Sequence, residues 1–248
     1  MKNLAAQNYW DNSYSGFKYY VENDSVTNWL STKILNLGIK SVFEFGCFPG
    51  RYLSYLGLKG FTVSGIDLTP RIDLDFKDWL NNLDISFDEI IRDDAIKYTD
   101  KSEKFFDLVC SFGFIEHFEN FEEIILCHDR ILKKDGYLCL TTPNFKGYLQ
   151  YNLHKYFDSI NLSRHFIPSM DPFIWADLLE KRGYSILYCG YFGGFSFWVD
   201  KEKRSFFKKL LLYMILGISK IPGMSRIKSG KNYSPFCGII AKKNNYEY

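Results

Sequence analysis

The segment Ser41–Arg51 (SVFEFGCFPGR) constrains the fold more than any other stretch of the chain. It begins with an apolar run, Val42–Phe45, and continues through Gly46 into a turn that contains Pro49 and Gly50. The residues that follow, rich in leucine and tyrosine, have the character of a helix start. A strand, a glycine turn and a helix in this order are typical of an open α/β sheet, where they form one side of a nucleotide-sized crevice. The sequence therefore predicts an α/β nucleotide-binding fold.

Further apolar runs predict the rest of the sheet. Apolar residues at helical spacing predict a helix over 121–133, and Asp171 with Pro172 is a start signal for a second helix that ends at Gly183. Residues 144–170 show no clear period and are predicted to be irregular. Strands that alternate with helices indicate a mostly parallel, doubly wound sheet with right-handed crossovers. The predicted strands are 42–45, 61–66, 85–91, 105–112, 136–142, 184–189 and 236–241.

Composition narrows the class of protein. A net charge of +2 in 248 residues is close to neutral, which argues against a nucleic-acid partner, since such a partner needs concentrated positive charge. The first residues lack the apolar core of a signal peptide, and the six cysteines have no paired spacing. Both observations favour a cytoplasmic protein with reduced thiols. The longest strongly apolar stretch, residues 210–219, is too short to span a bilayer.

Acidic residues lie at the carboxyl ends of three of the predicted strands. Glu44 is among the last residues of the first strand, Asp67 follows the second, and Asp93 or Asp94 follows the third. In a doubly wound sheet these strand ends meet at one crevice. A carboxylate after the second strand suits ribose hydroxyls, one after the third suits an adenine amino group, and Glu44 suits an ammonium group. No Gly-x-x-x-x-Gly-Lys-Ser/Thr loop is present. The pattern therefore favours a nucleoside with a cationic rather than an anionic substituent.

Four blocks in this order resemble a known family: FEFGCFPGR, GIDLTP, RDDAIKY, and FDLVCSFGFIEHF followed by LKKDGYLCLTTPNF. Over residues 41–145 the chain resembles a class I S-adenosylmethionine-dependent methyltransferase, of the small-molecule group that includes the ubiquinone-biosynthesis O-methyltransferases. The resemblance implies a Rossmann-like sheet of seven strands with an antiparallel last strand. It also implies a single domain over 1–248, with an N-terminal lid or helix (1–40), a cofactor-binding core (41–145) and an acceptor cap with the last strand (146–248).

The resemblance also assigns residues to S-adenosylmethionine. The first turn would hold the methionine end, the segment after the second strand the ribose, the segment after the third the adenine, and the end of the fourth strand the crevice floor. The chain departs from the family at Phe48 and Pro49, where a glycine and a small residue are usual. Cofactor affinity is the property that we expect this difference to affect most. The assigned residues are Glu44, Gly46, Cys47, Gly50, Asp67, Leu68, Asp94, Ala95, Ser111 and Phe112.

Two histidines are candidates for the chemistry. His117 directly follows the fourth predicted strand and is the first choice for a general base or a group that orients the acceptor, although a histidine here is equally typical of a helix cap. His165, in the predicted irregular segment, is the second choice. The four histidines of the chain show no metal-ligand spacing, so the sequence predicts no metal site. N-terminal aromatic residues are expected either to cover the cofactor or to pack on the sheet edge.

The sequence thus predicts in-line methyl transfer from S-adenosylmethionine to the oxygen of a small molecule or a cell-surface glycan precursor. The alternatives are an inactive cofactor binder or scaffold, and a quinone or lipid methyltransferase at a membrane surface. Residues 203–222 lie within a basic, amphipathic stretch that begins at Lys201; it suits peripheral membrane contact, or packing on the sheet or a partner subunit. A monomer or a homodimer is expected.

Overall fold

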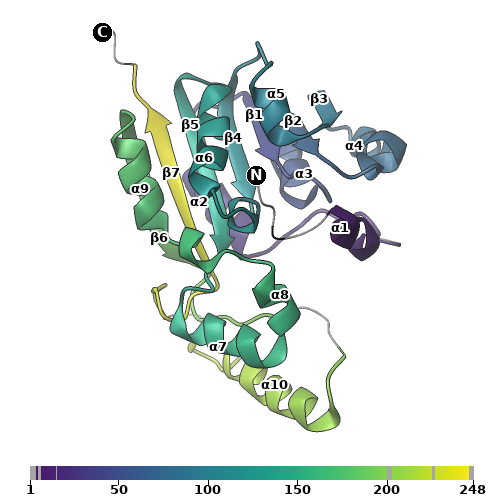
Figure 1. Cartoon of the computed structure of the whole chain (residues 1–248), viewed down its shortest axis with the longest axis vertical. Coiled ribbons are helices and arrows are strands. Elements are labelled where there is room, and N and C mark those ends of the chain that lie inside the picture. The colour runs from purple at the N-terminus through teal and green to yellow at the C-terminus, as the bar shows by residue number, and fades with distance from the viewer. Residues whose placement is uncertain (1–3, 5–6, 15, 200–202, 225–226, 246–248) are drawn as a thin grey trace.

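A computed structural model describes residues 4, 7–14, 16–199, 203–224 and 227–245. Its centre is a seven-stranded sheet in the order β3-β2-β1-β4-β5-β7-β6 (Figure 1). All neighbouring strands pair in parallel except at β7, which is antiparallel to both β5 and β6. The strands are β1 (Ser41–Phe45), β2 (Thr62–Asp67), β3 (Phe87–Arg92), β4 (Phe106–Phe112), β5 (Leu132–Pro143), β6 (Tyr184–Phe192) and β7 (Phe236–Lys243). The predicted fold class is confirmed.

Helices cover both faces of this sheet. Alternate residues of β1 point to opposite faces, so Val42 joins one core layer while Phe43 and Phe45 join the other. The helices are α1 (Gln7–Ser13), α2 (Ser25–Lys33), α3 (Arg51–Leu58), α4 (Lys77–Asn82), α5 (Ala95–Thr99), α6 (Phe121–Arg130), α7 (Tyr148–Phe157), α8 (Ser159–Ser163), α9 (Pro172–Glu180) and α10 (Phe206–Ile218). Residues of α2, α3 and α4 pack in the first layer, and those of α6 and α9 in the second.

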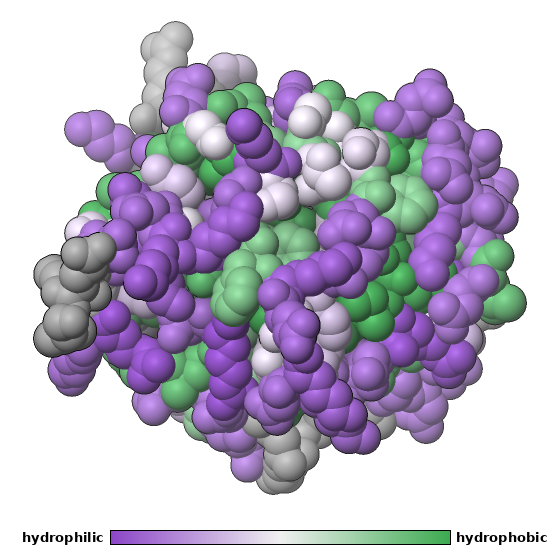
Figure 2. All heavy atoms as spheres, turned by 90° about the horizontal axis from the view of Figure 1, so that it is seen from above, coloured by the Kyte–Doolittle hydropathy of each residue, from purple (hydrophilic) through white to green (hydrophobic). Residues whose placement is uncertain are grey.

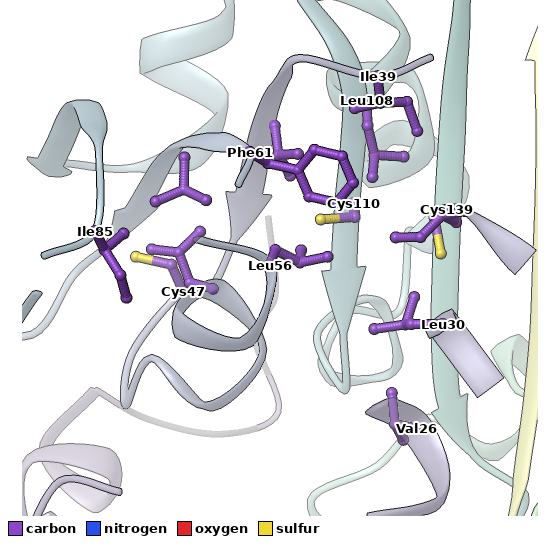
Figure 3. Close-up of a cluster of buried hydrophobic side chains, with 14 of the residues drawn as sticks. Val26, Leu30, Ile39, Cys47, Leu56, Phe61, Ile85, Leu108, Cys110 and Cys139 are labelled. Carbon is purple, nitrogen blue, oxygen red and sulfur yellow. The ribbon is translucent and has the colours of Figure 1, made fainter. Parts of the chain in front are cut away.

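The first core layer also holds three of the cysteines. Cys47, Cys110 and Cys139 are buried among leucine, isoleucine and phenylalanine side chains (Figure 3). All six cysteines are free thiols, as the absence of paired spacing predicts. Burial raises the pKa of Cys47 and Cys110 well above the usual range, because a thiolate would lose its hydration there. These thiols therefore act as small apolar side chains.

Two predictions about the second half of the chain are wrong. The helix predicted to reach residue 133 ends at Arg130, because Leu132 already pairs with Phe106 in the sheet. The segment 144–170, predicted to be irregular, contains α7, α8 and a short 3-10 turn, Ile167–Ser169. Helix α7 is stabilised by burial of Leu153 and Phe157 rather than by a clear apolar period. Together with α8 and α10 it forms a layer beyond the carboxyl ends of the parallel strands (Figure 1).

Candidate functional site

The turn after β1 is closed by backbone hydrogen bonds to the neighbouring strand. The amides of Gly46 and Cys47 both donate to the carbonyl oxygen of Ile66, at 2.9 and 3.1 Å. Gly46 and Gly50 have φ values of +67° and +82°, which glycine adopts without strain. A Cβ on Gly46 would also lie 2.6 Å from the ring of Phe114, in the segment that follows β4. Glycine at this position therefore lets the turn approach both β2 and the end of β4.

Two carboxyl groups, those of Glu44 and Asp67, lie at the carboxyl ends of β1 and β2. Asp67 accepts hydrogen bonds from the amides of Phe48, at 3.2 Å, and Thr69, at 3.0 Å, so it also fixes the glycine turn. Glu44 is buried, and its Oε2 has no hydrogen-bond partner among the described residues. Burial, with a smaller contribution from Asp67, raises the pKa of Glu44 well above its usual value. Burial also raises the pKa of Asp67 to about 6.

This pair fits the ligand that the resemblance implies. A buried carboxyl group without a partner is costly in free energy unless a cation or a donor satisfies it. The ammonium group of S-adenosylmethionine supplies both, and its ribose hydroxyls are donors for the free lone pairs of Asp67. Ser111, whose Oγ is also buried without a partner, lies beside Phe45 at the end of β4 and adds a third polar group to the same edge.

The side chain of Phe48 is buried beside the glycine turn. Its ring packs in the first core layer, with ring centroids 4.7 Å from Tyr14, 5.9 Å from Tyr19 and 5.6 Å from Phe76. The amide of Phe48 meanwhile remains bonded to Asp67. The residue that departs from the family pattern thus anchors the turn to the N-terminal segment.

We therefore expect Phe48→Ala to lower stability more than cofactor affinity. Truncating a buried phenylalanine costs about 3–5 kcal/mol, which lowers the midpoint of thermal unfolding by roughly 6–20 °C in a chain of this size. The dissociation constant of S-adenosylmethionine should change by less than about tenfold, because the hydrogen bonds of Asp67 are backbone bonds. Thermal unfolding and calorimetry measure the two effects. An unchanged melting temperature with much tighter binding would contradict this packing.

The remaining residues assigned to the cofactor lie around the same edge. Asp94 is the N-cap of α5, where its Oδ1 accepts from the amides of Ile96 and Lys97 at 3.0 and 3.1 Å. Ala95 is the first residue of that helix, and Leu68 is exposed directly after Asp67. The ring of Phe112 lies 4.8 Å from that of Tyr52. Helix capping alone explains one oxygen of Asp94, so its contact with adenine stays a prediction.

The N-terminal segment lies across this edge of the sheet. The ring centroids of Trp10 and His117 are 5.1 Å apart. The guanidinium carbon of Arg164 lies 3.8 Å from the ring centroid of Tyr9. The segment also borders a hollow of about 390 Å³ beside the residues that follow Asp67. Its lining residues are Asp11, Asn12, Tyr14, Gly16, Thr69, Pro70, Arg71 and Leu74. The N-terminal aromatics thus lie beside His117 and the first turn, and their role as a lid over the cofactor stays a prediction.

His117 and His165 come together with a third group that the sequence analysis missed. One possible metal-ligand atom from each of Glu116, His117 and His165 lies within 4.8 Å of the others. His117 Nδ1 lies 3.0 Å from the carbonyl oxygen of Arg164, and His165 Nδ1 lies 2.6 Å from that of Asn161. Because a carbonyl oxygen only accepts, the neutral tautomer with the proton on Nδ1 satisfies both contacts, and it leaves a lone pair on each Nε2.

The electrostatics of this cluster keep it uncharged. Burial lowers the pKa of His117 to about 4 and that of His165 to about 3, so both rings are neutral at pH 7. Burial raises the pKa of Glu116 to about 8, and neither of its carboxyl oxygens has a hydrogen-bond partner among the described residues. The free ring nitrogen of a neutral histidine in this cluster can accept a proton from an acceptor hydroxyl. The histidine nitrogens and the carboxyl oxygens of Glu116 also suit a divalent cation. Sequence spacing gave no sign of this cluster because His165 is 48 residues from His117.

Comparison with known proteins assigns the chain to a family. The profile of the methyltransferase-domain family matches residues 22–188. Ubiquinone biosynthesis O-methyltransferase from Haemophilus ducreyi is 28% identical over 149 residues, which are 58% of this chain and 63% of that protein. The chain thus spans less than two thirds of the length of this curated relative.

Solved structures share the fold. A SAM-dependent methyltransferase from Archaeoglobus fulgidus is 22% identical with a TM-score of 0.57, over 88% of this chain and 93% of the other. A plantazolicin methyltransferase, solved with a triazolic desmethylPZN analog and SAH, is 18% identical with a TM-score of 0.55, over 89% and 84% of the two chains.

The chain belongs to the methyltransferase-domain family. The predicted class, a methyltransferase, is confirmed at the level of this family. The roles of individual residues are not tested by the comparisons and remain predictions.

Proposed function

We propose that this chain transfers a methyl group from S-adenosylmethionine to a hydroxyl oxygen of a small-molecule acceptor. The observation that carries the proposal is the pair of carboxyl groups, Glu44 and Asp67, at adjacent strand ends in a fold of the methyltransferase family. The ubiquinone biosynthesis relative is an O-methyltransferase by name, which supports oxygen as the methylated atom. The plantazolicin methyltransferase was solved with a small molecule, which supports an acceptor of that size.

Each wall of the crevice has a proposed role toward the cofactor. Glu44 holds the ammonium group while Gly46, Cys47 and Gly50 admit the methionine end. Asp67 and Leu68 contact the ribose, Asp94 and Ala95 the adenine, and Ser111 and Phe112 form the floor. The unsatisfied Oε2 of Glu44 and Oγ of Ser111 support this assignment, since each needs a ligand donor or charge.

His117 is proposed as the general base, with His165 beside it. When bound, S-adenosylmethionine would supply a methyl group that the acceptor oxygen attacks in line, with S-adenosylhomocysteine as the leaving group. Alignment of the two reactants lowers the activation barrier by about 7–11 kcal/mol. His117 Nε2 takes the hydroxyl proton as the new carbon–oxygen bond forms, and Nδ1 stays bonded to the carbonyl oxygen of Arg164. The N-terminal segment, which contacts His117 through Trp10, opens for the acceptor and then excludes water.

The test is turnover on a panel of hydroxylated acceptors that includes phenols, sugars and amphiphilic lipids. The product S-adenosylhomocysteine is measured with each acceptor and without any. Acceptor-dependent product supports the enzyme. Cofactor binding with no product from any acceptor class favours an inactive cofactor binder, and no binding at all favours a scaffold. A glycan precursor, a quinone and a lipid are all acceptor classes within the proposal. The proposal also includes a cytoplasmic location and a chain that acts as a monomer or a homodimer.

A further inference from the structure

Helix α10 presents an apolar surface that the protein itself does not cover. Phe206 and Phe207 at its start are 74% and 80% exposed. The exposed apolar residues, named here the α10 surface, are Phe206, Phe207, Leu210, Leu211, Tyr213, Met214, Ile218 and Ile221. Single exposed apolar residues are common, but eight within sixteen residues form a patch that marks an interaction site.

The helix is attached to the protein by its other side. Leu212 is its buried residue, and it packs with Leu153 and Phe157 of α7 in a small cluster of its own. At 100° per residue, Leu212 and Leu216 project opposite to Phe207 and Met214. A helix that is apolar on both sides is normally buried on both sides. Because α10 lies at the outer end of the layer formed with α7 and α8, one of its apolar sides faces outward (Figure 1).

Basic residues surround the α10 surface. Residues 203–231, which include α10 and the segment after it, contain eight Lys and Arg and no Asp or Glu, although the whole chain has a net charge of only +2. Lys208, Lys209 and Lys220 belong to this segment, and the rest of the chain is therefore net acidic. At the end of the molecule opposite α10, hydrophilic side chains surround and separate the apolar areas (Figure 2). The basic charge is thus concentrated next to the uncovered apolar patch.

We propose that the α10 surface docks the protein on an anionic lipid membrane, with α10 lying in the plane of the interface. An exposed apolar side with basic residues beside it is the composition of interfacial helices, and each basic residue near an anionic bilayer contributes about 1 kcal/mol. With 13 residues α10 is too short to cross a bilayer, and within the described residues no helix has the length and hydropathy to do so. A second copy is a poorer occupant, because two α10 surfaces would bring like charges together.

Vesicle co-sedimentation of the full chain tests this proposal, and it needs neither cofactor nor turnover. We expect the chain to sediment with vesicles of phosphatidylcholine containing about 30% phosphatidylserine, and to partition at least tenfold less onto phosphatidylcholine alone. The variant Phe206→Ser/Phe207→Ser, and separately Lys209→Glu/Lys220→Glu, should each lower partitioning onto the anionic vesicles at least tenfold. Leu187→Ser and Lys134→Glu, exposed positions on β6 and β5, are the matched controls and should bind as the wild type does.

Three results would overturn the proposal. They are no sedimentation of the wild type with anionic vesicles, equal binding to neutral and anionic vesicles, and unchanged binding by the α10 variants. Thermal unfolding of each variant is measured in parallel, so that loss of binding is counted only for variants that are folded. If the wild type fails to bind vesicles but elutes as a dimer that the Phe206→Ser/Phe207→Ser variant converts to monomer, the surface is a self-association site instead. Failure of vesicle binding would leave the methyltransferase proposal untouched.

Discussion

Asp67→Ala is expected to raise the dissociation constant of S-adenosylmethionine at least about 100-fold. Hydrogen bonds to a charged group contribute about 1.5–3 kcal/mol each, and two bonds to ribose hydroxyls therefore account for roughly 3 kcal/mol or more. The same carboxylate accepts from the amides of Phe48 and Thr69, so its loss also loosens the glycine turn. Isothermal titration calorimetry measures the change.

The matched control for this variant is Asp78→Ala. Asp78 is an exposed acidic residue in the first turn of α4, so its removal changes the net charge equally without touching the crevice. It should bind the cofactor as the wild type does. Thermal unfolding of Asp67→Ala separates loss of a ligand contact from loss of the fold. If Asp67→Ala is folded and binds S-adenosylmethionine with wild-type affinity, the assignment of the ribose site is wrong.

His117→Gln is expected to lower kcat by about 10²–10⁴-fold and to leave cofactor affinity within about threefold of the wild type. That range is the usual contribution of a general base, and glutamine cannot accept the proton although it retains polar atoms. His117 is not among the residues proposed to contact the cofactor, so binding should persist. Single-turnover kinetics with the best acceptor, together with calorimetry, measures both quantities.

The control here is His128→Gln. His128 is also buried, with Nδ1 2.7 Å from the carbonyl oxygen of Ile124, but it belongs to α6 and packs in the core. It should affect stability and leave kcat close to that of the wild type. Dialysis against a chelator tests the other use of the cluster of Glu116, His117 and His165. A base mechanism predicts unchanged activity, whereas activity lost on chelation and restored by a divalent cation would show that His117 acts as a ligand.

Much of the fold could be predicted because apolar runs and strand-end residues are local signals. Glu44, Gly46 and Asp67 lie where the pattern of strand, turn and strand placed them, because parallel strands bring their carboxyl ends together whatever the surrounding helices do. The late strand 236–241 is indeed antiparallel, as β7. The helix predicted over 121–133 was too long because Leu132 is apolar in either structure, and only its pairing with Phe106 decides which one forms.

The unpredicted part of the site depends on contacts between distant segments. Phe48 packs against Tyr14 and Tyr19, and no local pattern shows that the N-terminal segment returns to the first turn. His165 reaches His117 because α7 and α8 fold where the sequence shows no clear period. Glu116 could have been noticed, since an acidic residue next to His117, four residues after an apolar strand, is unusual for a core position.

The most direct test of the central claim is calorimetric titration of the wild-type chain with S-adenosylmethionine and S-adenosylhomocysteine. The site predicts saturable binding of one molecule per chain with a dissociation constant below about 1 mM, the upper end of the range usual for enzyme substrates. Loss of that binding in Asp67→Ala and its retention in His117→Gln would match the roles given to the two residues. No saturable binding of either ligand to the folded wild-type protein would contradict the proposed function.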